Sequence, residues 1–157
     1  MSEIWSRKTE NATAWLTGRI VCPVYYEDTD FSGYVYHANY LKYFERAREE
    51  LVGLDYVREL YERGIHYVVS RVELKYHLPA KHGDRIEIVT KLRMSEHPIS
   101  EVRQEAHKLL PAGRREKLVS GTLKLVAVNQ EGEAIRVPKD VLDYFASLPS
   151  EEIPEGG

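Results

Sequence analysis

"VYYEDTDFSGYVYHANYLKYFERAREEL", residues 24–51, decides the fold because a turn rich in carboxylates passes directly into a helical pattern. Apolar side chains recur there with the period of an α-helix, at Tyr40, Phe44, Ala47 and Leu51. Charged side chains fall on the other faces, so the helix should bury one stripe against a sheet. Gly53 follows and is expected to end this helix.

Strand patterns surround this helix on both sides. The segment 18–26 is rich in β-branched and aromatic residues, although Pro23 indicates an edge or a bulge. After a short helical connection closed by Gly64, four more strands are predicted, in residues 66–80, 85–94, 100–110 and 117–129. A last helix should begin near Pro138.

Two of these strands alternate clearly between apolar and polar residues. In 66–80 the inward face of a half-buried antiparallel strand is predicted to hold Val68, Ser70, Val72, Leu74, Tyr76 and Leu78. In 85–94 the inward side chains should be Ile86, Ile88, Leu92 and Met94. Four successive antiparallel strands with one apolar face need a cover, and the long helix is the candidate. The predicted fold class is therefore α+β, a curved antiparallel sheet wrapped around one long central helix.

Length and composition favour one domain in a reducing compartment. The 157 residues suit a single core, here 18–148, between an N-terminal extension, 1–17, and a loose acidic tail, 149–157. The single cysteine, Cys22, excludes an internal disulfide framework. No apolar leader opens the sequence, and no stretch reaches the about 18 apolar residues of a membrane span. We therefore expect a cytoplasmic protein without an integral membrane segment.

The charge pattern argues against nucleic acid as a partner. The 22 basic and 25 acidic residues are interspersed and leave a net charge of -3. Nucleic-acid binding requires a basic patch or stripe, and the sequence has none.

Three carboxylates, Glu27, Asp28 and Asp30, crowd together before the helix although like charges repel. The simplest interpretation is a solvated turn in which Asp30 or Ser32 caps the helix. A calcium loop is a second interpretation, because Asp28, Asp30 and Ser32 fit the early EF-hand positions. Asn39, however, stands where that loop needs a bidentate glutamate. No other spacing of His, Cys or Asp suggests metal ligands, so we expect neither a metal nor a cofactor.

A third interpretation of the carboxylates is catalytic. The free N–H groups and the positive dipole end of a helix start suit an oxyanion. A carboxylate held beside them can attack an activated carbonyl or take a proton from attacking water. A thioester suits such a site without a metal, because a thiolate is a good leaving group. An acidic residue near a helix start is common, so this spacing alone does not choose between the interpretations.

The motif "Y-Y-E-D-T-D-x-x-G-x-V-Y-H-A-N-Y-L-x-Y-F-E-R-A-R" resembles the signature of the Tol–Pal-associated acyl-CoA thioesterases. These enzymes are relatives of the 4-hydroxybenzoyl-CoA thioesterases, which have the hotdog fold. The similarity continues more thinly through residues 66–88 and 136–141. The fold that it implies, a long helix wrapped by an antiparallel sheet, agrees with the one that the periodicity predicts.

The resemblance implies that the protein hydrolyses acyl-CoA, with Asp30 as nucleophile or general base. It also implies that the backbone N–H of His37, at the helix start, polarises the thioester carbonyl. The active site would lie between two subunits of a homodimer or homotetramer. A non-catalytic acyl-thioester-binding or scaffold protein and a hydratase on the same fold remain as alternatives.

Further candidate residues surround this motif. Gly33, Tyr36, Asn39 and Arg93 are the candidate substrate-binding residues, Gly33 for close backbone approach and Arg93 for the phosphates of CoA. Arg48 falls on the apolar stripe of the helix, where a buried arginine needs a partner. We expect it to pair with Asp28 or Glu27.

Overall fold

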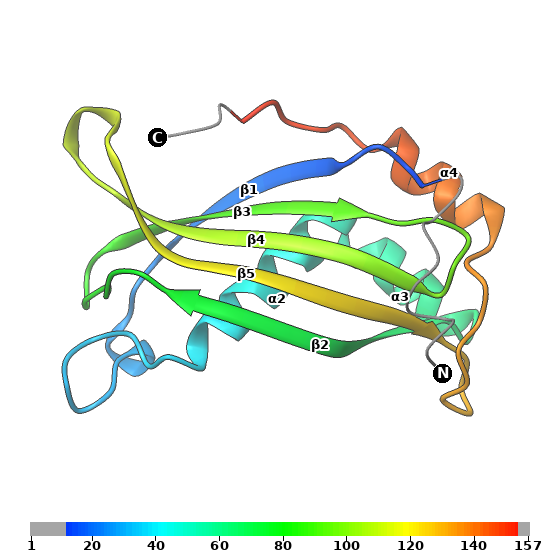
Figure 1. Ribbon diagram of the computed structural model, residues 1–157, viewed down its shortest axis with the longest axis horizontal. Coiled ribbons are helices and arrows are strands. Elements are labelled where there is room, and N and C mark those ends of the chain that lie inside the picture. The colour runs from blue at the N-terminus through cyan, green and yellow to red at the C-terminus, as the bar shows by residue number, and fades with distance from the viewer. Residues whose placement is uncertain (1–11, 154–157) are drawn as a thin grey trace.

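Five antiparallel strands form one sheet in the order β1-β3-β4-β5-β2 (Figure 1). The structure is a computed structural model that describes residues 12–153. The strands are β1 (Leu16–Pro23), β2 (His66–Tyr76), β3 (Arg85–Arg93), β4 (Ile99–Leu109) and β5 (Arg115–Val128). The helical elements are η1 (Tyr26–Asp28), α2 (Asn39–Val52), α3 (Leu54–Glu62), η2 (Pro111–Gly113) and α4 (Lys139–Ser147). The sheet crosses one side of α2, so the predicted helix-and-sheet arrangement is confirmed.

Most of the predicted stripe of the long helix is confirmed, although Leu51 is only partly buried and Tyr43 joins the buried face. Its buried side chains are Tyr40, Tyr43, Phe44 and Ala47. Phe44 is 0% exposed and lies near Gly121 of β5, where an added Cβ would lie 3.0 Å from its ring. Glycine at this position therefore allows α2 to approach the sheet closely. Gly53 ends the helix with a φ of 96°, which glycine adopts without strain.

The strand order differs from the expected succession of four neighbouring strands. β3, β4 and β5 follow one another as expected, but β2 pairs with β5 and β1 pairs with β3. α2 and α3 connect β1 to β2 and carry the chain from one edge of the sheet to the other (Figure 1). β1 and β2 are therefore both edge strands.

The expected half-buried face of β2 is wrong, whereas that of β3 is confirmed. Ile86, Ile88, Leu92 and Met94 are all buried. Five of the six side chains expected to face inward from 66–80 are exposed in the single chain, namely Val68, Ser70, Val72, Tyr76 and Leu78. β2 lacks a neighbouring strand on its outer side within residues 12–153, and a register shift between Val69 and Arg71 interrupts its alternation. Alternation predicts the faces of a strand but not which of them the chain covers.

The ends of the described chain meet along β1. β1 begins at Leu16, inside the expected extension, and ends at Pro23, where the predicted strand continued to residue 26. In the expected tail, 149–157, the hydroxyl oxygen of Ser150 accepts a hydrogen bond of 2.9 Å from the N–H of Thr17. The N–H of Glu151 donates one of 2.8 Å to the carbonyl of Thr17. Residues 1–11 and 154–157 lie outside the described part of the chain.

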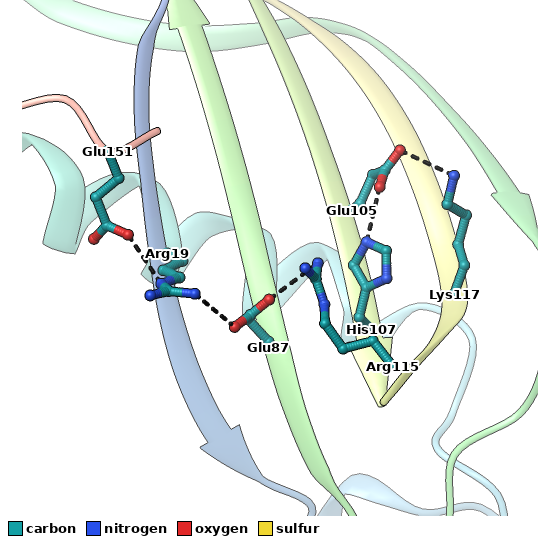
Figure 2. A network of polar contacts seen from close by, with 7 residues as sticks. All are labelled: Arg19, Glu87, Glu105, His107, Arg115, Lys117 and Glu151. Carbon is teal, nitrogen blue, oxygen red and sulfur yellow. Dashed lines mark hydrogen bonds and ion pairs between the residues drawn. The ribbon is translucent and has the colours of Figure 1, made fainter. Parts of the chain in front are cut away.

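The face of the sheet turned away from α2 carries an ionic network (Figure 2). Glu87 is 5% exposed and lies between Arg115, at 3.0 Å, and Arg19, at 3.5 Å. Next to them, Nε2 of the buried His107 lies 2.8 Å from a carboxylate oxygen of Glu105. Lys117 contacts the other oxygen of Glu105 at 3.2 Å. Charged side chains on this face are thus paired where they are buried. Within residues 12–153, no helix is both long enough and apolar enough to cross a membrane.

Candidate active site

The carboxylates lie on a tight loop that connects β1 to α2. Thr29 and Val35 form an antiparallel bridge at its base. The N–H of Asp30 donates a hydrogen bond of 2.9 Å to the carbonyl of Tyr34, and the N–H of Gly33 donates one of 3.0 Å to the carbonyl of Asp30. Gly33 adopts a φ of 84°, and an added Cβ would meet no heavy atom within 4 Å. The loop therefore presents Asp30 at an open turn directly before the helix.

Asp30 has an exposed, ionised carboxylate. Its Oδ1 accepts a hydrogen bond from the Ser32 hydroxyl and a second, of 2.8 Å, from the Ser32 N–H. The hydroxyl bond first and the backbone bond second lower the pKa of Asp30, and the charge of His37 acts in the same direction. Because no residue among 12–153 donates a hydrogen bond to Oδ2, this oxygen can meet a substrate or a water molecule.

Asp28 has a structural place in the loop. Its Oδ2 accepts a hydrogen bond of 2.8 Å from the N–H of Tyr25. Its backbone carbonyl accepts two, from the side-chain amide of Asn39 and from the N–H of Tyr36, each 2.9 Å long. Asn39 is the first residue of α2, so these bonds fix the helix start to the loop. Burial raises the pKa of Tyr43, and the charge of Asp28 raises it further.

The side chains of Asp28 and Asp30 accept hydrogen bonds from different donors, the N–H of Tyr25 and the N–H of Ser32. Across the described residues, no group of three or more His, Cys, Asp and Glu side chains is arranged to hold a metal ion. The calcium interpretation therefore gains no support from the geometry of the loop.

His37 lies two residues before the first helical residue of α2 rather than at it. Its backbone carbonyl accepts a hydrogen bond of 2.8 Å from the hydroxyl of Tyr76, at the end of β2. Its own N–H meets no acceptor within the part of the chain that the structure describes. The ring of Tyr36 lies 4.5 Å from the His37 ring, and an open pocket of about 250 Å³ lies between His37, Tyr40 and Tyr76. The N–H of His37 is thus available to an acceptor from outside residues 12–153.

Arg93 lies far from this loop in the single chain. Arg93 is the last residue of β3. The loop lies at the other end of this strand, where the carbonyl of Asp84 accepts a hydrogen bond from the N–H of Val24. Eight residue steps along a strand span roughly 26 Å. Arg93 donates a hydrogen bond of 2.7 Å to Glu101 and stacks on Trp15 at 4.5 Å. The structure thus brings Asp30, Gly33, Tyr36, His37 and Asn39 together and leaves Arg93 outside.

The expected pairing of Arg48 with Asp28 or Glu27 is wrong. Arg48 donates a hydrogen bond of 2.9 Å to the side-chain oxygen of Gln104, a buried residue at the centre of β4. Arg48 is the tenth of fourteen residues in α2, so it points at the middle of the sheet and not at the loop before the helix. The amino-acid sequence does not indicate Gln104, Tyr76 and Ser32 as hydrogen-bond partners of Arg48, His37 and Asp30. For Gln104 a signal existed, since it alternates with the apolar residues Val102 and Ala106 along the strand.

The chain matches the model of the thioesterase-like superfamily over residues 24–145. It is 46% identical over 72 residues to the acyl-CoA thioesterase YbgC of Helicobacter pylori, which is 46% of this chain and 53% of that protein. It is 39% identical over 71 residues to the acyl-CoA thioester hydrolase YbgC of Escherichia coli O157:H7, again 53% of that protein and 44% of this chain. The chain thus spans about half the length of these curated relatives.

The fold is also found among solved structures. The 4-hydroxybenzoyl CoA thioesterase from Pseudomonas sp. strain CBS-3 superimposes with a TM-score of 0.72 and 18% sequence identity. The superposition covers 82% of this chain and 99% of that one. At this identity the likeness shows the fold, which is the expected hotdog arrangement.

Proposed function

Because the chain belongs to the thioesterase-like superfamily, we propose that it hydrolyses an acyl-CoA thioester to a free acid and CoA. One observation carries this proposal. The ionised carboxylate of Asp30 lies on the loop that leads into α2, and the N–H of His37 next to the helix start is available to an oxyanion. A nucleophile or base and an oxyanion donor are the two parts that acyl transfer requires.

Asp30 acts through Oδ2, since Oδ1 is engaged by Ser32. In one route Oδ2 attacks the thioester carbon, the C–S bond breaks, CoA leaves as a thiolate, and water then hydrolyses the mixed anhydride. In the other route Oδ2 takes a proton from a water molecule that attacks the same carbon, and the C–S bond then breaks as CoA leaves as a thiolate. In both routes the N–H of His37 donates to the developing oxyanion, and Tyr76 holds the adjacent carbonyl of His37 in place. Both routes need the ionised form of Asp30.

A second copy of the chain is the proposed partner. β2 is an edge strand, and its side chains Val68, Val69 and Val72 are each at least 40% exposed. An apolar strand edge of this length is a template for pairing with another strand. Pairing β2 with the β2 of a second copy would cover these side chains and extend the sheet. It would also shield the pocket beside His37, since Tyr76 belongs to the same strand.

The test is release of free thiol from a panel of acyl-CoAs, followed with a thiol-reactive dye. The panel should contain short, medium and branched aliphatic chains and aromatic acyl groups. We expect at least one to be hydrolysed with saturable kinetics, and the activity to survive EDTA. Saturable binding of acyl-CoA without thiol release from any member would instead favour an acyl-thioester-binding protein.

A further inference from the structure

A cavity of about 310 Å³ lies between the C-terminal half of α2, α3 and the sheet. Its residues from α2 begin at Glu45, whereas Asp30 precedes the first turn of that helix, so the cavity is separate from the candidate active site. Most of its wall is apolar, from Val52, Leu60, Leu92, Met94, Leu125 and Phe145. Its volume is at the lower end of the range for small-molecule sites.

Two hydroxyl groups in this wall have no partner. The side-chain oxygens of Tyr67 and Ser100 are buried without a hydrogen-bond partner among residues 12–153. Ser100 is 0% exposed. Ser100 and Val69 both pair with Leu125, so Ser100 lies two strands in from the β2 edge of the sheet. Native proteins rarely leave buried polar groups without a partner, and a bound molecule would supply one here.

The guanidinium of Arg48 is a further polar group in the wall, which also includes Glu45, Glu49, Tyr61 and His66. Its polar contact is with a neutral group, the amide oxygen of Gln104. No carboxylate of the described chain lies within ion-pairing distance of it. Glu45 interacts electrostatically with Arg48 only at longer range. Both Glu45 and Glu49, the residue after Arg48, are exposed to solvent. A partly buried cation without an anionic contact is a favourable position for the oxygen of an anion.

We propose that this cavity binds a small carboxylic acid in its ionised form. The apolar body of the acid packs against the leucine, methionine and phenylalanine side chains of the wall. Its carboxylate accepts hydrogen bonds from Arg48, and the hydroxyls of Tyr67 and Ser100 are further donors. The proposed hydrolysis releases a free carboxylic acid, so its product is one candidate source of the bound acid. Only this statement about the source rests on the proposed function.

Binding is tested by calorimetry on the whole protein at pH 7.5, with octanoate as the probe and 1-octanol as a neutral control of equal chain length. We expect saturable binding of octanoate and at least about 10-fold weaker binding of 1-octanol, because a hydrogen bond to a charged group is lost. Equal affinities, or no saturable binding of octanoate, would contradict the proposal.

Two variants assign the bound octanoate to this cavity. Tyr67→Phe and Ser100→Ala each remove a hydroxyl that has no partner among residues 12–153, so the fold should be unaffected. Each should weaken octanoate binding about 3- to 10-fold. Tyr61→Phe is the matched control, since Tyr61 lines the same cavity with its side chain 68% exposed. Arg48→Gln should weaken binding by more, with its melting temperature measured in parallel. Unchanged affinity in both Tyr67→Phe and Ser100→Ala would place octanoate elsewhere.

Inhibition of thiol release by octanoate tests whether the bound acid is the reaction product or a separate effector. An increase in KM alone indicates that the free acid competes with the acyl group of the substrate, and a decrease in kcat indicates a separate effector. Either effect should be weaker in Tyr67→Phe, and equal inhibition of that variant would contradict the assignment. Calorimetry needs no acyl-CoA, so the cavity can be tested even if hydrolysis is not observed.

Discussion

The guanidinium of Arg48 donates a hydrogen bond of 2.9 Å to the side-chain oxygen of Gln104, across the contact between α2 and the centre of the sheet. The side-chain amide of Gln104 donates in turn to the carbonyl of Phe44 and to the hydroxyl of Thr90, each at 2.8 Å. Gln104 is 1% exposed. One buried side chain therefore fixes the helix to two strands in a core that is mostly apolar.

Gln104→Met should destabilise the protein by about 2–3 kcal/mol, because it keeps the size of the side chain but leaves the guanidinium of Arg48 without its acceptor. The free energy of unfolding in urea measures the loss. Gln130→Met is the control at an exposed turn, where a substitution usually changes stability by less than about 0.5 kcal/mol. Equal unfolding free energies for the two variants would show that the bond to Arg48 contributes nothing.

Tyr76→Phe should lower kcat about 10-fold with little change in KM. The variant loses the hydrogen bond that holds the carbonyl of His37, and small displacements of a positioned group are costly in catalysis. Steady-state kinetics on the best acyl-CoA measure the effect. Tyr26→Phe is the control, since Tyr26 is 81% exposed and lies on the connection between β1 and α2 that also carries His37. A change confined to the melting temperature would reduce Tyr76 to a structural role.

The ionic network on the outer face of the sheet should make stability depend on pH (Figure 2). Burial lowers the pKa of His107, against the opposing hydrogen bond to Glu105. His107 in the unfolded chain then binds a proton more readily than His107 in the folded protein. The contribution of neutral His107 to the free energy of unfolding is therefore fully present above the ordinary histidine pKa of about 6.5. It is lost as pH falls from there through the lower folded pKa.

Urea unfolding at pH 7.5, 6.5 and 5.5 measures this dependence. In His107→Gln the decrease between pH 7.5 and 5.5 should be smaller than in the parent protein. His82→Gln is the control, since His82 is exposed. Parallel pH profiles for the parent and the His107 variant would disprove the assignment.

Much of the fold could be predicted because its signals are local. The stripe that ends at Leu51 has the period of one helix, and Ile86 and Ile88 alternate within one strand, so neighbouring residues suffice. The exposure of Val72 could not be predicted, because it depends on where β2 lies in the sheet. The partner of Arg48 could not be predicted either, since Gln104 is 56 residues away and meets it only after folding.

The candidate site was predicted in the same uneven way. The loop with Asp30 and His37 was found from a continuous motif, and the structure brings these residues to one place beside α2. For Ser32, which donates to Asp30, the sequence suggests only a helix cap or a calcium-loop position, and for Tyr76 only an inward-facing strand residue. Both contacts depend on side-chain directions that the spacing of residues does not determine.

Val72→Lys should convert the proposed dimer into a monomer at micromolar concentration. In the proposed dimer the β2 strands of two copies pair with each other. The variant would place a lysine on each of these strands, and the two like charges would repel. Light scattering measures the molecular mass. Val21→Lys is the control on the opposite edge strand, since Val21 is 43% exposed on β1. A monomeric parent protein, or equal dissociation of both variants, would rule out pairing through β2.

The most direct test of the proposed hydrolysis compares thiol release by Asp30→Asn and Glu27→Gln on the best acyl-CoA. Asn keeps the size of Asp30 and its acceptor for Ser32 but removes the charge. We predict that Asp30→Asn loses at least about 100-fold in kcat, the lower range for a positioned base, while it still binds acyl-CoA. Glu27→Gln removes an exposed charge three residues away and should keep the parent rate. Hydrolysis by Asp30→Asn at the parent rate would contradict the mechanism.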